Sequence, residues 1–441
     1  MKFKLLPLYS CVFYEKIMNK NSKDTSCSVT DRVRSGLTRR YRAEKRFRWL
    51  GICAIFLSLL FLVILFGDIL IKGVPAFSQT RIKLTIFFDP GLLPVENLES
   101  ANYNALVKSS CRKLFPEVKG RRDKRALYKL VSEGAAYELQ EKVLRNPDLI
   151  GTTKDFWLIA DDEVDMLMKG KISRDSAGRY NQQQLSWIKK LEHEGRLRRQ
   201  FNFTFFSNGD SRDPELAGIL GALSGTVLTL ALTLLLSFPV GIGAAIYLEE
   251  FLKRGKFSDF LEVNINNLAA VPSIIFGLLG LGVFINFFGL PRSSPLIGGL
   301  VLALMTLPTI IISSRAAIKA VPPSIREAAL GLGASPVQVV FHHVLPLAMP
   351  GMLTGTIIGM ARALGETAPL LMIGMVAFIV DIPKSFNAAA TVLPVQIYLW
   401  ADSPERAFSE RTSAAIIVLL VFLILMNATA VFLRRKFERR W

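Results

Sequence analysis

The hydrophobic positions of this chain fall in long, uninterrupted blocks rather than at the short helical or strand periods of a soluble core. A block of about 20 apolar residues lets a helix cross the hydrocarbon core of a membrane, roughly 30 Å thick, because each residue rises about 1.5 Å. We therefore expect an all-α membrane protein. Six spans are predicted, at about residues 49–71, 216–248, 265–288, 295–318, 348–380 and 413–433.

A polar stretch, residues 72–214, separates the first two predicted spans and carries many charges of both signs. Its length suits a small soluble domain, either mixed or helical. Segment 182–200 predicts an amphipathic helix, because apolar residues recur there at helical intervals. The aromatic run 201–206 alternates, which fits either a strand or an interfacial belt. The single histidine of the stretch, His193, has no partner in view, so we expect a packing or docking domain without catalytic chemistry.

The chain carries 54 Lys and Arg against 36 Asp and Glu, a formal charge of +18. Much of the excess lies in segment 1–48, before the first span, and in the tail 434–441. Basic flanks of this kind are typical of topology signals and headgroup contacts rather than of nucleic-acid binding. An even number of spans puts both termini on one side, and the flanks predict that this side is cytoplasmic. Residues 72–214 would then be extracytoplasmic, because long domains cross the membrane largely regardless of charge.

The first predicted span follows a basic stretch, as a signal peptide does, but it is too long and has no small-residue cleavage site. We therefore expect a retained helix. Four scattered cysteines, Cys11, Cys27, Cys53 and Cys111, indicate neither a disulfide framework nor a zinc site. The sequence contains no Gly-x-x-x-x-Gly-Lys-Ser/Thr motif and no triad of Ser, His and Asp. The chain is not expected to be an enzyme, and energy for transport would have to come from another chain.

Residues 321–346, between the fourth and fifth predicted spans, predict two short helices at an angle, which we call the elbow. Ser324 and Glu327 form a capping-box pattern that would begin the first helix. Gly331 and Gly333 would end it, because glycine tolerates a positive φ.

The second helix of the elbow would begin at Ser335, with Pro336 in its first turn and Gln338 as reciprocal acceptor, and Pro346 would stop it. A rigid elbow is suited to receive a push from a soluble partner. From the spacing alone, Glu327 could equally complete a cap in a loop that is only well folded.

Several fixed positions of the elbow resemble the EAA loop of bacterial ABC importer permeases. The shared pattern is Glu-Ala-Ala, three residues, Gly, nine residues and an apolar-x-Leu-Pro ending; His343 stands where that family usually has Ile or Val. The matching residues are Glu327, Ala328, Ala329, Gly333, Leu345 and Pro346. In that family the loop forms coupling helices that sit in a groove of the ATP-binding subunit, so the resemblance implies an ATPase-coupling role for these residues.

Three further segments, at 205–219, 265–282 and 361–374, resemble the PstA family, the permeases of the phosphate-specific transport system. Segment 205–219 resembles the longer variants of that family, which carry an extra N-terminal extracytoplasmic region. The resemblance implies a type I ABC importer permease of a bacterial inner membrane that moves inorganic phosphate into the cytoplasm. It also implies the partners: a PstC-like second permease, two PstB-like subunits that bind ATP and Mg, and a PstS-like extracytoplasmic phosphate-binding protein.

Two charges, Arg362 and Glu366, lie within the fifth predicted span, where a charge costs roughly 2.5–3.5 kcal/mol at the centre of a membrane helix. Four residues apart, they share a helix face and can pair. They form either a structural ion pair or a site in the translocation pathway, where Arg362 binds an oxyanion, Glu366 holds its guanidinium and Thr367 adds a donor. The resemblance favours the pathway. Arg315, at the end of the fourth span, either lines the exit or extends to headgroups.

Alternatives from other classes remain open at this stage. The elbow would be the same in kind in a permease for sulfate, molybdate or phosphonate. A membrane sensor or signalling protein would instead read a ligand through residues 72–214. A secondary transporter should show inverted repeats and a coupling-ion cluster, and the sequence shows neither.

Overall fold

The computed structural model describes residues 29–172, 180–376 and 378–437, and the chain divides into two units, Met1–Gly67 and Asp68–Trp441. In the first unit, helix α1 (Val29–Gly73) contains the whole first predicted span, 49–71, and continues on both sides of it. Two of the four cysteines, Cys11 and Cys27, lie outside the described residues.

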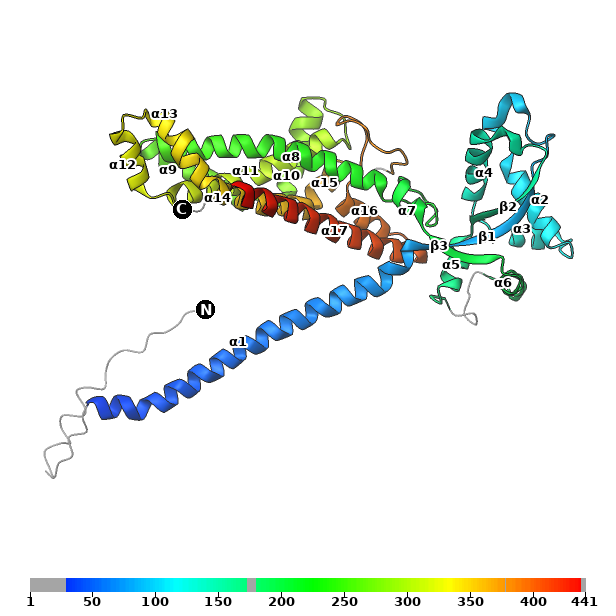
Figure 1. Cartoon of the computed structure of the whole chain (residues 1–441), viewed down its shortest axis with the longest axis horizontal. Helices are drawn as coiled ribbons and strands as arrows, with labels where there is room; N and C mark the ends of the chain where they lie inside the picture. The colour runs from blue at the N-terminus through cyan, green and yellow to red at the C-terminus, as the bar shows by residue number, and fades with distance from the viewer. Residues whose placement is uncertain (1–28, 173–179, 377, 438–441) are drawn as a thin grey trace. The chain divides into compact units, whose positions relative to one another are not determined.

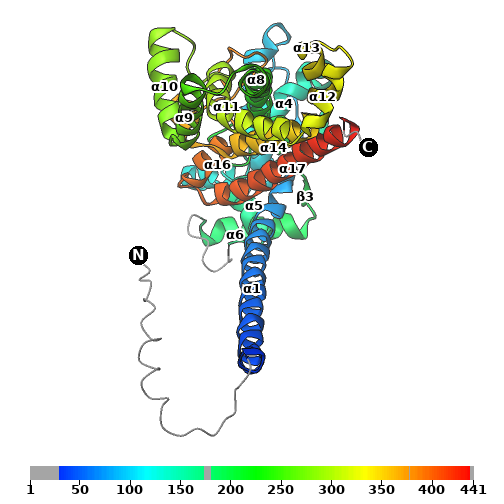
Figure 2. The same cartoon turned by 90° about the vertical axis from the view of Figure 1, so that its left-hand side faces the viewer.

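Four long helices of the second unit pack side by side (Figures 1 and 2). Helix α8 packs against α11, α11 against α14, and α14 against α17. Together with α1, they give five helices in the described part of the chain that are long and apolar enough to cross a membrane, and a bent helix pair brings the number up to six. The bounds are Leu220–Ile246 for α8, Pro295–Lys319 for α11, Leu345–Gly365 for α14 and Arg406–Phe437 for α17.

Small residues allow close approach between these helices. A methyl group on Gly351 of α14 would lie 2.6 Å from the Cβ of Ala317 of α11, and one on Gly241 of α8 would lie 2.7 Å from Ile310. Lipid provides no hydrophobic drive between spanning helices, so van der Waals contact at such small residues is a main source of packing energy. The glycines therefore fix the helix spacing of the bundle.

The third predicted span, 265–288, is a bent helix pair in the structure. The structure has α9 (Lys256–Ala270), followed by α10 (Ser273–Leu279) and a π-helical stretch to Phe287, with a bend of 99° between them (Figure 2). The cause is Pro272, which has no amide donor and forces the residue before it into an extended conformation; Val271 has φ −66° and ψ 130°.

The fifth predicted span, 348–380, also differs. Helix α14 ends at Gly365, and a short helix, α15 (Ala368–Met372), follows after an extended residue, Glu366 (φ −82°, ψ 113°). Between α15 and α16 (Leu393–Ala401), the described residues form no further helix or strand. The hydrophobic block is therefore long enough for one span, but it contains a break.

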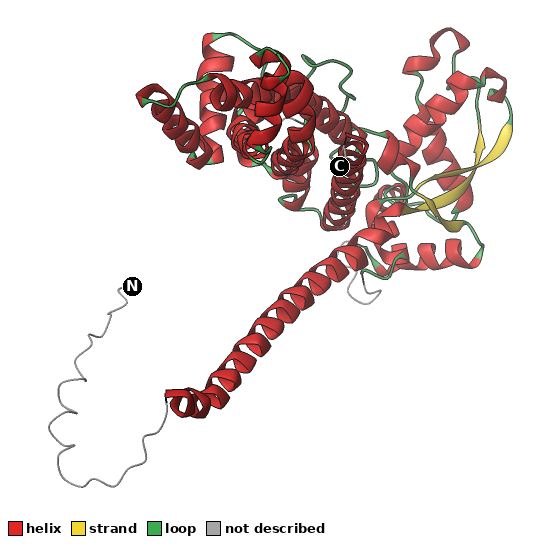
Figure 3. Ribbon diagram, turned by 60° about the vertical axis from the view of Figure 1, so that its left-hand side comes forward, coloured by secondary structure: helices red, strands yellow, loops and turns green. Residues whose placement is uncertain are grey.

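Residues 78–207 form a separate core, which we call the sheet domain (Figure 3). Its three antiparallel strands have the order β2-β1-β3, with β1 in the centre. Alternate residues of β1, Ile82, Leu84 and Ile86, are buried against the helices. The strands are β1 (Ser78–Phe87), β2 (Thr153–Ile159) and β3 (Leu197–Phe201).

Five helices of the described residues pack around the sheet, so the domain is mixed, and a sixth follows β3 and packs at the start of α8. The predicted helix 182–200 is α6 only as far as His193, after which the chain turns into β3. The run 201–206 is mainly the short helix α7, with Phe205 fully buried, so it is not a strand. The helices are α2 (Tyr103–Leu114), α3 (Arg121–Tyr128), α4 (Gly134–Arg145), α5 (Asp162–Met168), α6 (Gln182–His193) and α7 (Phe203–Ser207).

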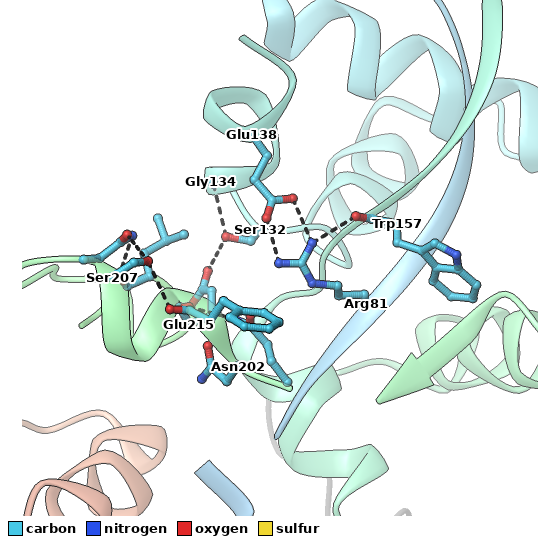
Figure 4. A network of polar contacts seen from close by, with 12 residues as sticks. Arg81, Ser132, Gly134, Glu138, Trp157, Asn202, Ser207 and Glu215 are labelled. Atoms are coloured by element: carbon cyan, nitrogen blue, oxygen red, sulfur yellow. Dashed lines mark hydrogen bonds and ion pairs between the residues drawn. The ribbon is translucent and has the colours of Figure 1, made fainter. Parts of the chain in front are cut away.

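Buried polar contacts join the sheet domain to the segment that leads into α8. The Ser132 hydroxyl donates to Oε1 of Glu215 at 2.6 Å, and the Gln79 amide donates to the backbone carbonyl of Glu215 at 2.7 Å. Figure 4 shows the first contact, close to Arg81, whose guanidinium donates to Glu138 and to the backbone carbonyl of Trp157. The domain thus rests on the helices at the N-terminal end of α8.

Candidate functional site

The first helix of the elbow is α12 (Pro323–Gly331). The predicted Ser324–Glu327 capping box is wrong: Pro322 is the N-cap, no side chain caps the helix, and Ser324 already lies inside it. Pro323 in the first turn lacks the amide donor that a cap would satisfy. The helix ends as predicted. Gly333 has φ +89°, and the amide of Ala334 donates back to the carbonyl of Ala329 at 3.1 Å.

The two faces of α12 differ in burial. Ala329 is only 5% exposed and packs among Ile318, Val339 and Val344, where a larger side chain would separate the helices. The opposite face, with Glu327 and Ala328, is exposed. Just beyond the helix, Leu332 is 91% exposed. Leu330, Val337 and Phe341 of the elbow are exposed as well, and several exposed apolar side chains on one segment are typical of a surface that a partner covers.

The second half of the elbow begins with the predicted capping box. The Ser335 hydroxyl accepts from the amide of Gln338 at 3.3 Å, and the Gln338 side chain accepts from the amide of Ser335 at 2.9 Å. These residues begin α13 (Pro336–Gln338). The prediction that Pro346 stops this helix is wrong. A π-helical turn (Val339–Val344) follows α13, and the chain passes through Leu345 and Pro346 directly into α14.

A proline removes one amide donor, and a widened turn before it accommodates its ring. The stretch Pro336–Gly365, 30 residues, is long and apolar enough to cross a membrane as one unit. A displacement of the elbow would be transmitted into α14 without an intervening flexible loop.

One ion pair anchors α12 to the end of α8. Nη2 of Arg326 lies 2.8 Å from Oε1 of Glu250, in the π-helical turn Tyr247–Phe251 that ends α8. The same guanidinium donates to the backbone carbonyls of Ile318 and Val321, at 2.9 and 2.7 Å, at the end of α11. Sequence reasoning missed this contact. The available signal was an acidic pair at the end of the second span and an arginine beside the Glu-Ala-Ala motif.

Arg315, predicted to line the exit or to extend to headgroups, pairs with two carboxylates. Its Nη2 lies 3.1 Å from Glu262 of α9, and its Nε lies 3.4 Å from Glu249 after α8. Lys319 adds a contact of 3.5 Å to Glu249. These charges join the middle of α9 and the last turns of α11 to the end of α8 near the elbow.

Arg362, Glu366 and Thr367 surround the break after α14. Nε of Arg362 lies 3.5 Å from Oε1 of Glu366, a long ion pair, and the Arg362 side chain is 51% exposed. The two do not share one helix face as expected, because Glu366 lies beyond the helix end. Thr367 is partly buried and precedes α15.

The break is held in place from α10. A methyl group on Gly277 would lie 2.7 Å from the Cα of Pro369, so the backbones of α10 and α15 are nearly in contact. Within the ranges that the structure describes, no group of three or more His, Cys, Asp and Glu side chains is arranged to hold a metal ion. Of the two described cysteines, Cys53 is exposed and Cys111 is buried, and burial raises the pKa of the Cys111 thiol to about 12.

The C-terminal part of the chain matches a known protein family. Residues 237–441 match the binding-protein-dependent transport system inner membrane component, a region that includes the elbow and the break at Gly365. Residues 34–178 match a domain of unknown function (DUF3333), which takes in most of α1 and much of the sheet domain. The elbow and this match define the class: the chain is a multi-pass inner membrane permease of an ABC importer. Such permeases are not themselves catalytic and work with ATPase and substrate-binding partners.

Curated relatives narrow the class. The chain is 30% identical over 223 residues to the phosphate transport system permease protein PstA 1 of Mycobacterium tuberculosis, covering 51% of this chain and 72% of the relative. It is 29% identical over 235 residues to PstA of Haemophilus influenzae, covering 53% of this chain and 81% of the relative. The chain belongs to the PstA family of phosphate transport system permeases.

Two further proteins are similar to this chain. The probable ABC transporter permease YqgI of Bacillus subtilis is 34% identical over 173 residues, covering 39% of this chain and 58% of the relative. Among solved structures, an inward-facing methionine ABC transporter, MetNI, aligns over 49% of this chain and 95% of the matched chain, with 19% identity and a TM-score of 0.40.

Proposed function

We propose that this chain is the permease subunit through which an ABC importer moves inorganic phosphate into the cytoplasm. The similarity to PstA proteins, over more than two thirds of the M. tuberculosis relative, supports the substrate. The elbow is the observation that supports the mechanism. Glu327 and Leu332 are exposed on it, where a partner can bind, and its buried face packs against the spanning helices.

In this proposal the energy comes from two PstB-like subunits that hydrolyse ATP with Mg. Their closure pushes the elbow. The push reaches α8 through the Arg326–Glu250 pair and reaches α14 through the continuous stretch Pro336–Gly365. The spanning helices then change from an outward-open to an inward-open arrangement, and ATP binding and hydrolysis change which of these two states is populated.

A PstC-like second permease would pair with this chain, and the pathway would run between the two. Arg362 supports this arrangement, since it is half-exposed at the break after α14. Its guanidinium fork matches an oxyanion such as phosphate, Glu366 would orient it, and Thr367 would add a hydroxyl donor. Arg315 already has two carboxylate partners, so we assign it to holding the helix ends rather than to binding the anion.

We further propose that both termini and the elbow are cytoplasmic and that the sheet domain is extracytoplasmic, where a PstS-like protein delivers phosphate. The sheet domain contacts the chain just before α8 begins, and the elbow contacts the turn where α8 ends. Since α8 is 27 residues long, these contacts lie on opposite sides of a membrane. The basic flanks then select the cytoplasmic side.

Uptake by intact cells tests the proposal. Cells that lack this chain, starved of phosphate, should lose high-affinity uptake of labelled phosphate and regain it with the wild-type chain, while sulfate and molybdate uptake stay unchanged. A loss of sulfate or molybdate uptake, with phosphate uptake unaffected, would instead assign the chain to another oxyanion.

A further inference from the structure

The sheet domain contains a cavity of about 1570 Å³ that the transport proposal does not use. Helix α3 and its flanks form one wall, and Asp161, Tyr180 and Glu215 contribute to the other. We call this cavity the basic pocket. Its volume exceeds the roughly 300–1,000 Å³ of ordinary small-molecule sites, so it has room for an extended ligand.

The wall at α3 consists of cations without acidic partners. Six cations at this wall line the pocket and take part in none of the ion pairs in the described part of the chain. They are Lys119, Arg121, Arg122, Lys124, Arg125 and Lys129. Lys108, from α2, lies over the ring of Tyr128 at 5.9 Å instead. These six cations lie on and beside a helix of eight residues whose one acidic residue is Asp123, so like charges outnumber it and a bound anion would relieve their repulsion.

Carboxylates also line the pocket, and for two of them the partners are clear. The six acidic residues are Glu133, Asp161, Asp162, Glu163, Asp213 and Glu215. Oδ1 of Asp161 accepts from the Tyr180 hydroxyl at 2.7 Å and from the amide of Glu163 at 3.2 Å. Oε1 of Glu215 accepts from Ser132 at 2.6 Å, and burial raises the pKa of Glu215 to about 7. The lining thus carries both charges, and the cations at α3 are the part of it that an anion would contact.

We propose that the basic pocket binds a multivalent, phosphate-bearing anion, such as a short oligophosphate or the phosphate headgroup of an anionic lipid. A single inorganic phosphate is too small to reach cations spread along α3, which is about 12 Å long. Several linked phosphoryl groups supply both the charge and the closely spaced acceptor oxygens that Arg forks and Lys ammonium groups bind.

The location of the pocket gives binding a route to the transport helices. Ser132, in the pocket lining, holds Glu215, and Glu215 lies five residues before the start of α8 at Leu220. Next to it, Gly134 packs so closely on Leu216 that an added methyl group would overlap the leucine side chain. A ligand on α3 would thus be linked to the entry of α8 by two direct contacts.

The test measures binding to the full-length chain in a phosphate-free detergent such as dodecyl maltoside, so it is independent of transport. Tripolyphosphate is titrated by calorimetry against the wild-type chain and against the variant R121Q/R122Q/R125Q. The matched control is R198Q/R199Q, which removes exposed arginines of β3 outside the pocket. A second pocket variant, K124Q/K129Q, is used if the first does not fold. Liposomes with phosphatidylglycerol or with phosphatidylcholine alone provide the lipid arm.

We expect saturable tripolyphosphate binding that weakens at least tenfold in the pocket variant, weakens with added salt, and is unchanged in the control. If only phosphatidylglycerol liposomes bind in a pocket-dependent way, the ligand is the lipid headgroup. Three outcomes would overturn the proposal. They are binding of an acidic peptide in place of both probes, equal losses of binding affinity in the pocket and control variants, and no saturable binding of either probe.

Discussion

The ammonium group of Lys169 lies 2.6 Å from a carboxylate oxygen of Glu410, which joins the sheet domain to the first turns of α17. Lys169 also lies 2.6 Å from Asp165, and its side chain is only 2% exposed. Glu410 is 241 residues further along the chain. A charge buried this deeply is tolerated because it is paired on both sides.

We predict that Lys169→Met destabilises the chain by about 3–5 kcal/mol, because it removes the ammonium group that pairs directly with two buried carboxylates. The double variant Lys169→Met/Glu410→Met should lose less than the sum of the single variants. Thermal unfolding of the purified chain in detergent measures both, and Lys154→Met, on an exposed residue of β2, is the control. Additive losses would show that the pair does not couple the two elements.

A second prediction concerns the link between α12 and α8. Glu250→Gln should lower phosphate uptake by the assembled transporter at least tenfold while ATP hydrolysis continues, because the push on α12 no longer reaches α8. The exchange Glu250→Arg/Arg326→Glu should recover part of the uptake. Arg254→Gln, an exposed charge just beyond the same turn, should have no effect. Full uptake in Glu250→Gln would remove this pair from the mechanism.

Gly333 offers a matched pair of substitutions within the elbow. Gly333→Ala forces a side chain into φ +89°, at a cost of roughly 1–2 kcal/mol. We expect it to loosen the elbow and reduce the phosphate taken up per ATP hydrolysed in proteoliposomes. Gly331→Ala is the control, because Gly331 has no positive φ and an added methyl group meets nothing within 4 Å. Equal uptake per ATP in the two variants would contradict the importance of this turn.

Substitutions can show whether Arg362 and Glu366 form an anion-binding site or only a structural ion pair. If Arg362 binds phosphate, Arg362→Gln should reduce uptake more than tenfold, and removing the partner charge in Arg362→Gln/Glu366→Gln should not restore it. If the two residues only neutralise each other, the double variant should regain most of the uptake. The measurement is initial uptake rate against phosphate concentration, with protein abundance in the membrane as the control.

The buried carboxyl group of Glu215 predicts a pH dependence of stability. The pKa of Glu215 rises from an ordinary value of 4.5 to about 7, mainly because burial disfavours the charged carboxylate. Between these values the folded chain binds a proton that the unfolded chain has lost, so stability falls as pH rises from about 4.5 to about 7 and is level above that. The loss is on the order of 3 kcal/mol.

Glu215→Gln should reduce this pH dependence and raise the melting temperature at pH 8, because the amide oxygen can still accept from Ser132. Part of the slope should remain, since burial also raises the pKa of Asp161 to about 7. Asp213→Asn, an exposed carboxylate two residues earlier, is the control and should keep the wild-type slope. A Glu215→Gln variant with the same slope as wild type would show that this carboxylate is not the group that titrates.

The sequence predicted the membrane class, the number of hydrophobic blocks and the position of the elbow, because block length and turn residues act locally. It did not predict the central strand β1, although Ile82, Leu84 and Ile86 alternate with polar residues there. It placed Arg362 and Glu366 on one face, because hydropathy alone does not reveal a helix that ends within an apolar block. The Arg326–Glu250 pair joins residues that are 76 apart, and only tertiary structure brings them together.

Site-specific crosslinking of the elbow to its partner tests the proposed mechanism most directly. In a chain without its native cysteines, Leu332→Cys places a thiol on the most exposed apolar side chain of the elbow, and Lys154→Cys places one on the sheet domain. In membranes that contain the whole transporter, Leu332→Cys should crosslink to the ATP-binding subunit, and Lys154→Cys should not. A crosslink from Lys154→Cys to that subunit, or none from Leu332→Cys in a complex that hydrolyses ATP, would contradict the assignment of the elbow as the docking site of the motor.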